Sequence, residues 1–184
     1  MLIGFTGPQS SGKSTLLQSM HTSDKFRKCS FVKEVTRKVA SKGLAINQSG
    51  DNLTQLHILN EHLNNHTHNG ECTVLDRCII DGYIYTDYLH SIGLVDSWVL
   101  DYAGKLLSLL GPQLSVVLYT DPADVNLVDD GVRSTDSSFR NTIIEMFDDF
   151  ISDTALLQKV VPNANVVKLS GDVSTRLRLI EQSI

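Results

Sequence analysis

Cysteines, long apolar runs and surplus positive charge are scarce or missing in this sequence, and each shortage excludes a class of protein. The three cysteines, Cys29, Cys72 and Cys78, are too few and too widely spaced for a disulfide framework or a CxxC metal site. Their odd number also suits a reducing compartment. No apolar run approaches the ~20 residues that a membrane-spanning helix needs, so we expect no membrane segment.

The charge balance is acidic, because 16 lysines and arginines stand against 21 aspartates and glutamates, for a net charge of −5. Such a chain lacks the overall basic surface with which proteins grip duplex DNA, and a nucleic-acid partner is therefore not expected. The first residues, Met-Leu-Ile-Gly-Phe-Thr, contain no basic segment and no small-residue cleavage site. We therefore expect no signal peptide and a cytoplasmic location.

The length of 184 residues and the hydrophobic content of 41% fit one globular domain with a normal core. The chain has no internal repeat, no low-complexity tract and no linker rich in proline, glycine or serine. We expect a single domain over residues 1–184, and the sequence leaves open whether two copies form a homodimer.

Short apolar runs alternate with longer segments of helical periodicity along the chain. The apolar runs predict strands at residues 2–6, 30–34, 72–76, 114–120 and 166–169. The periodic segments predict helices from residue 13 and at residues 36–41, 51–66, 81–92, 95–110, 139–151 and 173–184. In the segment at 95–110, one predicted apolar face carries Val95, Trp98, Val99, Tyr102, Leu106 and Leu110.

Strands that are separated by helices need crossover connections, so this order predicts an α/β fold with a parallel sheet and helices on both faces. Ligands in such sheets bind beyond the carboxyl ends of the strands. The predicted strands end in polar or glycine-containing turns at Gly7, Glu34, Asp76, Asp121 and Gly171. The chemistry of the protein is therefore predicted to lie at these turns.

The turn after the first strand has the complete pattern of a phosphate-binding loop, or P-loop, G-x-x-x-x-G-K-[ST]. It reads Gly7-Pro8-Gln9-Ser10-Ser11-Gly12-Lys13-Ser14 and is followed by Thr15. Gly7 and Gly12 permit a close approach of backbone N–H groups to phosphate oxygens. Lys13 is predicted to reach the β- and γ-phosphates of a nucleotide, and the Ser14 hydroxyl to ligate Mg²⁺. A strand before the loop and a helix after it, which the pattern requires, are both predicted.

Acidic residues and arginines follow the second and third predicted strands. Glu34 ends the second strand with Arg37 one turn later, and Asp76-Arg77 ends the third with Asp81 behind it. Phosphoryl transfer needs a carboxylate near Mg²⁺, a base for the attacking hydroxyl and cations for the transferred charge. These residues supply that set, although Glu34 and Arg37 alone also fit a solvated ion pair. Asp81 is expected to be structural, as a helix-start residue or a partner of Arg77.

Two further arginines lie between the fourth strand and the next helix. Arg133 follows Asp129-Asp130-Gly131-Val132, and Arg140 comes seven residues later. Arginines beside a turn and a helix start suit a mobile lid that closes guanidinium groups onto phosphates. An ordinary surface loop, in which neighbouring aspartates pair with both arginines, is the alternative.

The histidines and tyrosines in the middle of the chain are interpreted as structural. His62 and His66 share a helix face at a spacing that can hold zinc, but no metalloprotease glutamate stands between them and the stretch is rich in asparagine. We therefore predict a polar, solvated helix surface there. Tyr83 and Tyr85 are expected in the core or at its rim, with base stacking by one of them as the alternative.

In their order along the chain, these motifs resemble those of the P-loop nucleoside and nucleotide kinases, and in particular the small AAA-type ATP-binding proteins related to the nicotinamide riboside kinase domain, including kinases carried by bacteriophages. The likeness rests on the P-loop, Glu34-x-x-Arg37, Gln55, Asp76-Arg77 with Asp81 and Tyr85, Asp130-Gly131-x-Arg133 and Arg140. It spans nearly the whole chain. It implies a P-loop fold with the parallel strand order 2-3-1-4-5, a helical lid at about residues 124–141, and ATP and Mg²⁺ as cofactors.

The resemblance also implies roles for individual residues. Glu34 would face the acceptor hydroxyl, Asp76 and Arg77 would handle Mg²⁺ and the acceptor, Gln55 would contact its base, and the turn at Gly171 would hold adenine. The catalytic candidates are Lys13, Glu34, Asp76, Arg77, Arg133 and Arg140. The ATP-binding candidates are Gly7, Gln9, Ser10, Ser11, Gly12, Lys13, Ser14, Thr15 and Gly171. The acceptor-binding candidates are Glu34, Arg37, Gln55, Arg77 and Tyr85, and the Mg²⁺ ligands are Ser14 and Asp76.

The expected activity is therefore ATP-dependent phosphorylation of a small molecule. Cys78 replaces the aromatic of thymidylate kinases, and Val35 replaces the proline of many deoxynucleoside kinases, so the acceptor stays open between a nucleoside, a nucleoside monophosphate and a pyridine nucleoside. An ATPase or switch that acts on a protein partner is one alternative. A kinase of a modified base or end in DNA is the other, and it depends on a basic cluster made of Lys25, Arg27, Lys28, Lys33, Arg37 and Lys38.

Overall fold

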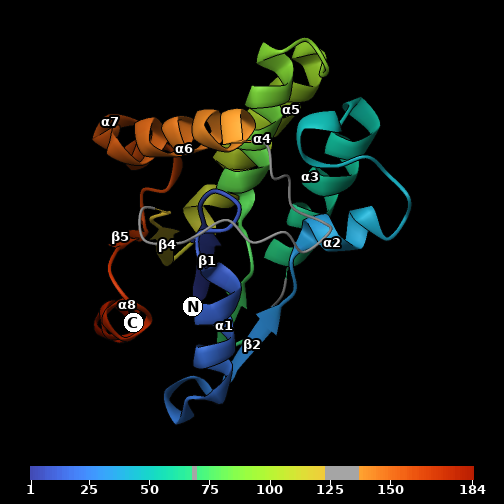
Figure 1. Ribbon diagram of the computed structural model, residues 1–184. Coiled ribbons are helices and arrows are strands. Elements are labelled where there is room, and N and C mark those ends of the chain that lie inside the picture. The colour runs from blue at the N-terminus through green and yellow to red at the C-terminus, as the bar shows by residue number, and fades with distance from the viewer. Residues whose placement is uncertain (68–69, 123–136) are drawn as a thin grey trace.

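The computed structural model describes residues 1–67, 70–122 and 137–184. Its sheet consists of β1 (Leu2–Thr6), β2 (Cys29–Val32), β3 (Cys72–Leu75), β4 (Val116–Thr120) and β5 (Asn165–Leu169). The strands lie in the order β2-β3-β1-β4-β5, and each neighbouring pair is parallel (Figure 1). The predicted α/β class and the strand order 2-3-1-4-5 are confirmed.

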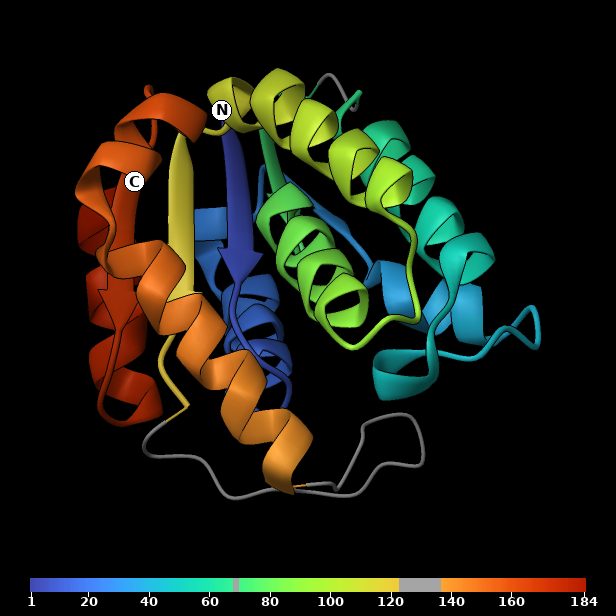
Figure 2. The same ribbon diagram turned by 90° about the horizontal axis from the view of Figure 1, so that it is seen from above.

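Helices cover both faces of this sheet (Figure 2). In the described residues they are α1 (Lys13–Thr22), α2 (Val35–Ala40), α3 (Asn52–His66), α4 (Ile79–Ser91), α5 (Ser97–Leu110), α6 (Ser137–Ser152), α7 (Thr154–Val160) and α8 (Val173–Ser183). Single 3-10 turns are η1 (Asp24–Phe26), η2 (Asn47–Ser49) and η3 (Gly111–Gln113). Within these ranges, no helix is both long and apolar enough to cross a membrane.

The sheet separates two apolar layers, as a parallel sheet buried on both faces requires. On one face Ile3 packs in a cluster with Leu16 of α1 and Ile180 of α8. The larger cluster on the other face joins the sheet to α3, α4, α5, α6 and α7. Gly4 faces that second layer, where an added Cβ atom would lie 2.8 Å from the Cβ of Cys78. Glycine at this position therefore lets the start of α4 approach β1 closely.

Two element boundaries near the carboxyl end of the sheet differ from the sequence pattern. The predicted strand at 30–34 already ends at Val32, and Glu34 is the N-cap residue of α2. Helix α4 begins at Ile79, two residues before the predicted start, because the Asp81 carboxylate accepts a hydrogen bond of 3.4 Å from the Cys78 amide and closes a capping box. Asp81 is therefore a helix-start residue, as predicted.

Two further features of the helices differ from what the sequence predicts. Helix α7 was not predicted, because its two turns are too short for a periodic signal. The sequence signal for its start is the N-cap residue Asp153, whose carboxylate accepts a hydrogen bond of 2.9 Å from the Leu156 amide. Trp98 was assigned to the buried face of α5, but its side chain is 54% exposed and donates to Asp96 at 3.3 Å. The buried face is centred on Val99 and its helical neighbours instead.

The cysteine spacing predicted no disulfide framework and a reducing compartment, yet two of the three cysteines form a disulfide. Cys29 on β2 and Cys72 on β3 are direct neighbours in the parallel register, with Cα atoms 4.5 Å apart. The sequence does not reveal this contact, because the two cysteines are 43 residues apart along the chain and only the pairing of the two strands brings them together. Cys78 is a buried free thiol.

The predicted lid at about 124–141 falls largely on residues 124–136, which lie outside the described residues, as does Arg133. Residues 137–141 form the first turn of α6. Figure 2 shows that β1 points toward the end of the molecule at which α6 begins. The P-loop and the start of α6 are thus at the carboxyl end of the sheet, where ligands bind in folds of this class.

Candidate active site

The P-loop has the backbone conformation that the glycine pattern predicts. Gly7 and Gly12 have φ angles of 135° and 86°, and Ser10 between them has a φ of 55°. A Cβ atom on Gly7 would lie 2.7 Å from the Thr120 hydroxyl oxygen and 2.9 Å from the Thr120 carbonyl oxygen. Gly7 is therefore required both by its conformation and by the closeness of β4.

Lys13 lies buried at the start of α1, and its ammonium group holds the loop. Its Nζ atom donates to the carbonyl oxygens of Gly7 and Pro8 at 2.8 and 2.6 Å, and to the Ser11 hydroxyl at 3.0 Å. Burial, assisted by the positive charge of Arg77, lowers the pKa of Lys13 to about 7. The lysine is therefore placed where phosphate oxygens can replace backbone carbonyls as its partners.

The other P-loop candidates differ in where their side chains lie. Ser14 and Thr15 are exposed on the first turn of α1, as a hydroxyl that meets Mg²⁺ requires. Ser10 and Gln9 are buried. Gln9 lines a cavity that Glu34 and Asp81 also line. Gly171 lies after β5 with a φ of 88°, a conformation that favours glycine.

Arg77 is the centre of the carboxylate–arginine group. Its Nε donates to Glu34 at 2.8 Å, and its Nη1 donates to Asp81 at 2.7 Å and to the Gly7 carbonyl at 3.1 Å. Arg37 donates to the second oxygen of Glu34 at 3.1 Å. The φ angle of Arg77 is 76°, which is uncommon for a side chain of this size and indicates local backbone strain.

The two candidate acids of the site have opposite pKa shifts. Burial raises the pKa of Glu34, but the charge of Arg77 and its hydrogen bond outweigh this, so that the pKa lies below its ordinary value. Burial, together with the negative charge of Glu34, raises the pKa of Asp76 to about 6. Glu34 is therefore ionised at neutral pH, whereas the carboxyl group of Asp76 titrates near neutral pH.

A cavity lies between the P-loop, α2, α3 and α4. Its volume is about 30 Å³ and it opens to solvent, so an acceptor larger than one or two water molecules would have to move its walls apart. Its walls include Gln9, Glu34, Arg37, Gln55, His62, Arg77, Asp81 and Tyr85. The structure thus brings the predicted acceptor-binding residues together around one space.

Gln55 and Tyr85 are held in fixed positions at this cavity. The Thr86 hydroxyl donates to Gln55 Oε1 at 3.0 Å, which orients the side-chain amide. The ring of Tyr85 lies 5.5 Å from the Arg77 guanidinium carbon and packs edge-on against Phe147. Tyr85 is thus a core and rim residue, as predicted, and its ring also lines the cavity.

The solvated surface predicted for His62 and His66 was wrong. Their side chains are 1% and 5% exposed, and burial lowers their pKa values to about 3 and 4, so both imidazoles are neutral. His62 lines the cavity beside Gly82, where an added Cβ atom would lie 2.9 Å from the imidazole. The burial of His62 could have been predicted from its spacing to Gln55 and Ile58, because this spacing places all three side chains on one face of α3.

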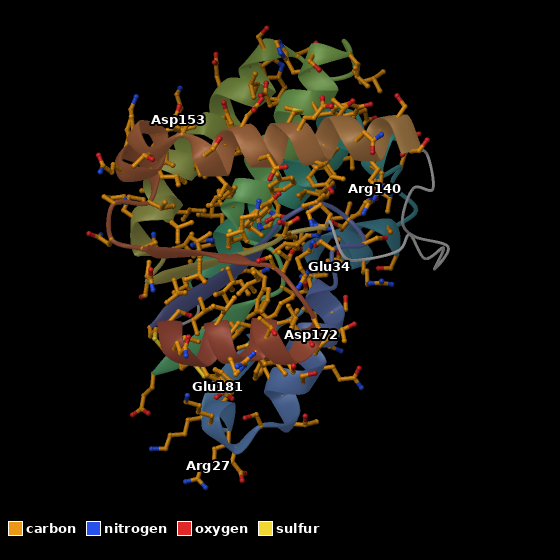
Figure 3. The ribbon with its side chains drawn as sticks, turned by 60° about the vertical axis from the view of Figure 1, so that its left-hand side comes forward. Arg27, Glu34, Arg140, Asp153, Asp172 and Glu181 are labelled. Carbon is orange, nitrogen blue, oxygen red and sulfur yellow. A yellow bond between two sulfur atoms is a disulfide. The ribbon has the colours of Figure 1, made fainter. Side chains whose placement is uncertain are left out.

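Arg140 lies near the start of α6, outside the set of residues that line the cavity. Its Nε and Nη2 atoms are buried, and no hydrogen-bond partner for them is found in the described part of the chain. Figure 3 shows Arg140 and Glu34 toward the same side of the molecule. A role of Arg140 in phosphate binding stays a prediction, and that of Arg133 lies outside the described residues.

The basic cluster on which the alternative of a DNA acceptor depends is partly neutralised by acidic residues. Lys25 pairs with Glu181 at 3.5 Å, and Lys38 pairs with Glu61 at 2.7 Å. Arg37 pairs with Glu34 of the cavity itself. Three of the six basic residues are thus engaged by acids, which weakens the case for a continuous phosphate-binding surface.

Comparisons with known proteins agree with this fold. A family model described as an AAA domain matches residues 2–176, whereas no curated protein sequence matches the chain. NadR in complex with NR has a similar fold, with a TM-score of 0.72 at 16% identity over 99% of this chain and 51% of that protein. The chain thus spans about half of NadR.

Two other solved structures are similar over most of both chains. Deoxyadenosine kinase from M. mycoides, with dCMP and dCDP bound, has a TM-score of 0.62 at 16% identity and is matched over 97% of its length and 99% of this chain. Thymidylate kinase from Candida albicans has a TM-score of 0.64 at 17% identity and is matched over 89% of its length and 98% of this chain. At these identities the likeness shows a shared fold. The family match covers nearly the whole sequence, and the chain therefore belongs to the AAA domain family.

Proposed function

We propose that the protein is an ATP- and Mg²⁺-dependent kinase that transfers the γ-phosphoryl group to a nucleoside or a (deoxy)nucleoside monophosphate. The observation that carries this proposal is the cavity beside the P-loop, since Gln9 belongs to both. A small acceptor in this cavity would lie next to the phosphates of a bound nucleotide. An ATPase that acts on a protein partner would have no need of such a cavity.

The described residues fit a bound nucleotide and its metal ion. The P-loop already has its left-handed residues in place, and Lys13 would exchange its carbonyl partners for phosphate oxygens. Ser14 and Asp76 would hold Mg²⁺, which would neutralise the charge that develops on the phosphates. Arg77, which donates to the Gly7 carbonyl of the P-loop, would add positive charge there, and Arg140 is a further candidate for this role.

Glu34 is the proposed base for the acceptor hydroxyl. Its carboxylate lines the cavity and is kept ionised and oriented by Arg77 and Arg37, so it can accept a hydrogen bond from a hydroxyl. Asp76 has the pKa nearer to neutrality, but it lies outside the residues that line this cavity. The position of Glu34 therefore supports its assignment as the base.

The chemistry of the cavity favours a nucleoside-like acceptor. Its walls combine two carboxylates, two guanidinium groups, three side-chain amides, a neutral imidazole and a phenol ring. Such a set suits a base with several hydrogen-bonding atoms and a sugar with hydroxyl groups. The names of the similar structures, which include a deoxyadenosine kinase, a thymidylate kinase and a complex with NR, point in the same direction.

The proposal is tested by measuring ADP release with ATP and Mg²⁺ over a panel of nucleosides, pyridine nucleosides and nucleoside monophosphates. We expect at least one member to raise ADP release well above the rate with ATP alone, with a phosphorylated product detected by mass spectrometry. Binding of ATP without turnover of any acceptor would contradict the proposal. Hydrolysis that is stimulated only by a macromolecule would favour the ATPase alternative.

The lowered pKa of Lys13 predicts that ATP binding is coupled to proton uptake. Without nucleotide the lysine loses its proton as the pH rises through about 7, whereas the triphosphate favours the protonated form. We therefore expect the Kd for ATP to rise by up to about tenfold per pH unit above pH 7. Calorimetry at pH 8 in buffers of different ionisation enthalpy measures the uptake directly. Lys13→Arg, whose charge does not titrate there, should abolish it, and equal heats in all buffers for the native protein would refute the coupling.

A further inference from the structure

Arg176 of α8 is a buried cation that the sequence motifs did not single out. Its side chain is 2% exposed, and its guanidinium group donates to three backbone carbonyl oxygens. Nε donates to Gly171 at 2.8 Å, Nη1 to Ser11 at 2.9 Å and Nη2 to Asp121 at 2.9 Å. Each nitrogen of the planar fork thus has its own acceptor, an arrangement that lysine cannot reproduce.

The three acceptors belong to three different loops. Ser11 is in the P-loop after β1, Asp121 is the first residue after β4, and Gly171 lies between β5 and α8. The strands β1, β4 and β5 are neighbours in the sheet, so Ser11, Asp121 and Gly171 lie side by side at its carboxyl end. One buried side chain therefore sets the spacing of these three backbone segments. Its hydrogen bonds come from a charged donor and are stronger than those between neutral groups.

The position of these loops indicates which ligand they serve. The cavity proposed for the acceptor lies on the side of β2 and β3, where Glu34 and Arg77 are found. An in-line transfer needs the donor and the acceptor on opposite sides of the transferred phosphoryl group. In that arrangement the nucleoside part of the donor would extend from the P-loop toward Asp121 and Gly171.

We propose that Arg176 is a positioning residue for the donor nucleotide, which holds the loops under the nucleoside in a fixed relation to the P-loop. This inference rests on the proposed function in that it takes ATP as the donor. The P-loop itself is also held by Lys13 and by the contact of 2.6 Å between the hydroxyls of Ser11 and Thr120. Loss of Arg176 should therefore affect the nucleoside more than the phosphates.

The test compares the binding of ATP and of inorganic tripolyphosphate to Arg176→Met and Arg176→Lys, each measured well below its melting temperature. We expect the Kd for ATP to rise at least about tenfold in both variants, and the Kd for tripolyphosphate to change less than about threefold. Millimolar methylguanidinium added to Arg176→Ala should restore part of the ATP affinity. Ile180→Ala is the matched control, since Ile180 is a buried residue of the same helix that faces the core.

The outcomes separate positioning from mere stability. Native ATP affinity in Arg176→Met and Arg176→Lys would overturn the inference, and so would equal losses for ATP and tripolyphosphate. An equal loss of ATP affinity in Ile180→Ala, at matched stability, would assign the effect to general loosening and also overturn it. Failure of the native protein to bind ATP would instead refute the proposed function, so the two failures are distinguishable.

Discussion

Replacing Lys13 with alanine is expected to abolish phosphoryl transfer while the protein stays folded. In the proposed complex the ammonium group would contact the phosphates, and nothing else in the P-loop carries a positive charge. We expect a fall in kcat/KM of at least about 10³-fold. The fold should tolerate the change, because the cost of burying the ammonium opposes the stability that its three hydrogen bonds contribute.

Two variants make the measurement specific. Lys13→Met keeps the length of the side chain and should be as inactive as Lys13→Ala, which separates the loss of charge from the loss of packing. Lys159→Ala removes an exposed lysine from α7 and should leave the rate unchanged. A Lys13→Ala protein that melts near the native temperature and retains substantial activity would exclude the P-loop from the transfer.

Replacing Glu34 with glutamine is expected to lower turnover far more than ATP affinity. The amide oxygen can still accept the hydrogen bond from Arg77, so the cavity should keep its shape, but it cannot take a proton from the acceptor. We expect kcat to fall by about 10²- to 10⁴-fold, the range of general base catalysis. The Kd for ATP should change less than about threefold, because Glu34 lies on the acceptor side of the P-loop.

Asp76→Asn and Glu61→Gln complete this experiment. Glu61 also forms an ion pair, with Lys38 at 2.7 Å, but it lies outside the residues that line the cavity, so Glu61→Gln should be as active as the native protein. Near-normal turnover of Glu34→Gln together with a large loss in Asp76→Asn would move the role of base to Asp76. That result would keep the kinase and change only the assignment within it.

Features that depend on neighbouring residues were predictable. The P-loop needs its glycines and lysine at fixed spacing, and the conformation of Gly7 and Gly12 agrees with that requirement. The alternation of strands and helices gave the parallel sheet, because crossover connections are restricted in number and hand. The strand order itself came from the resemblance to P-loop kinases, since alternation alone allows several orders.

The arrangement within the site depended on contacts between distant segments. Arg77 lies 43 residues after Glu34 and four before Asp81, yet its side chain joins both to Gly7 of the P-loop. The burial of His62 was missed because the face of α3 that it shares with Gln55 packs against α4, which a polar and asparagine-rich stretch does not reveal. The disulfide between β2 and β3 was missed for the same reason, because it also depends on a contact between distant segments.

Sequence alone thus predicted the P-loop pattern and the α/β layering, and it singled out Glu34, Arg37 and Arg77, which line the cavity beside the loop, since each follows from local spacing or periodicity. Only the tertiary structure decided which acid faces the cavity, which histidine lines it, and that Arg176 joins three loops at the carboxyl end of the sheet. The physical reason is that hydrogen bonds and burial depend on distance in space, and segments as far apart as Ser11 and Arg176 meet only when the sheet has formed.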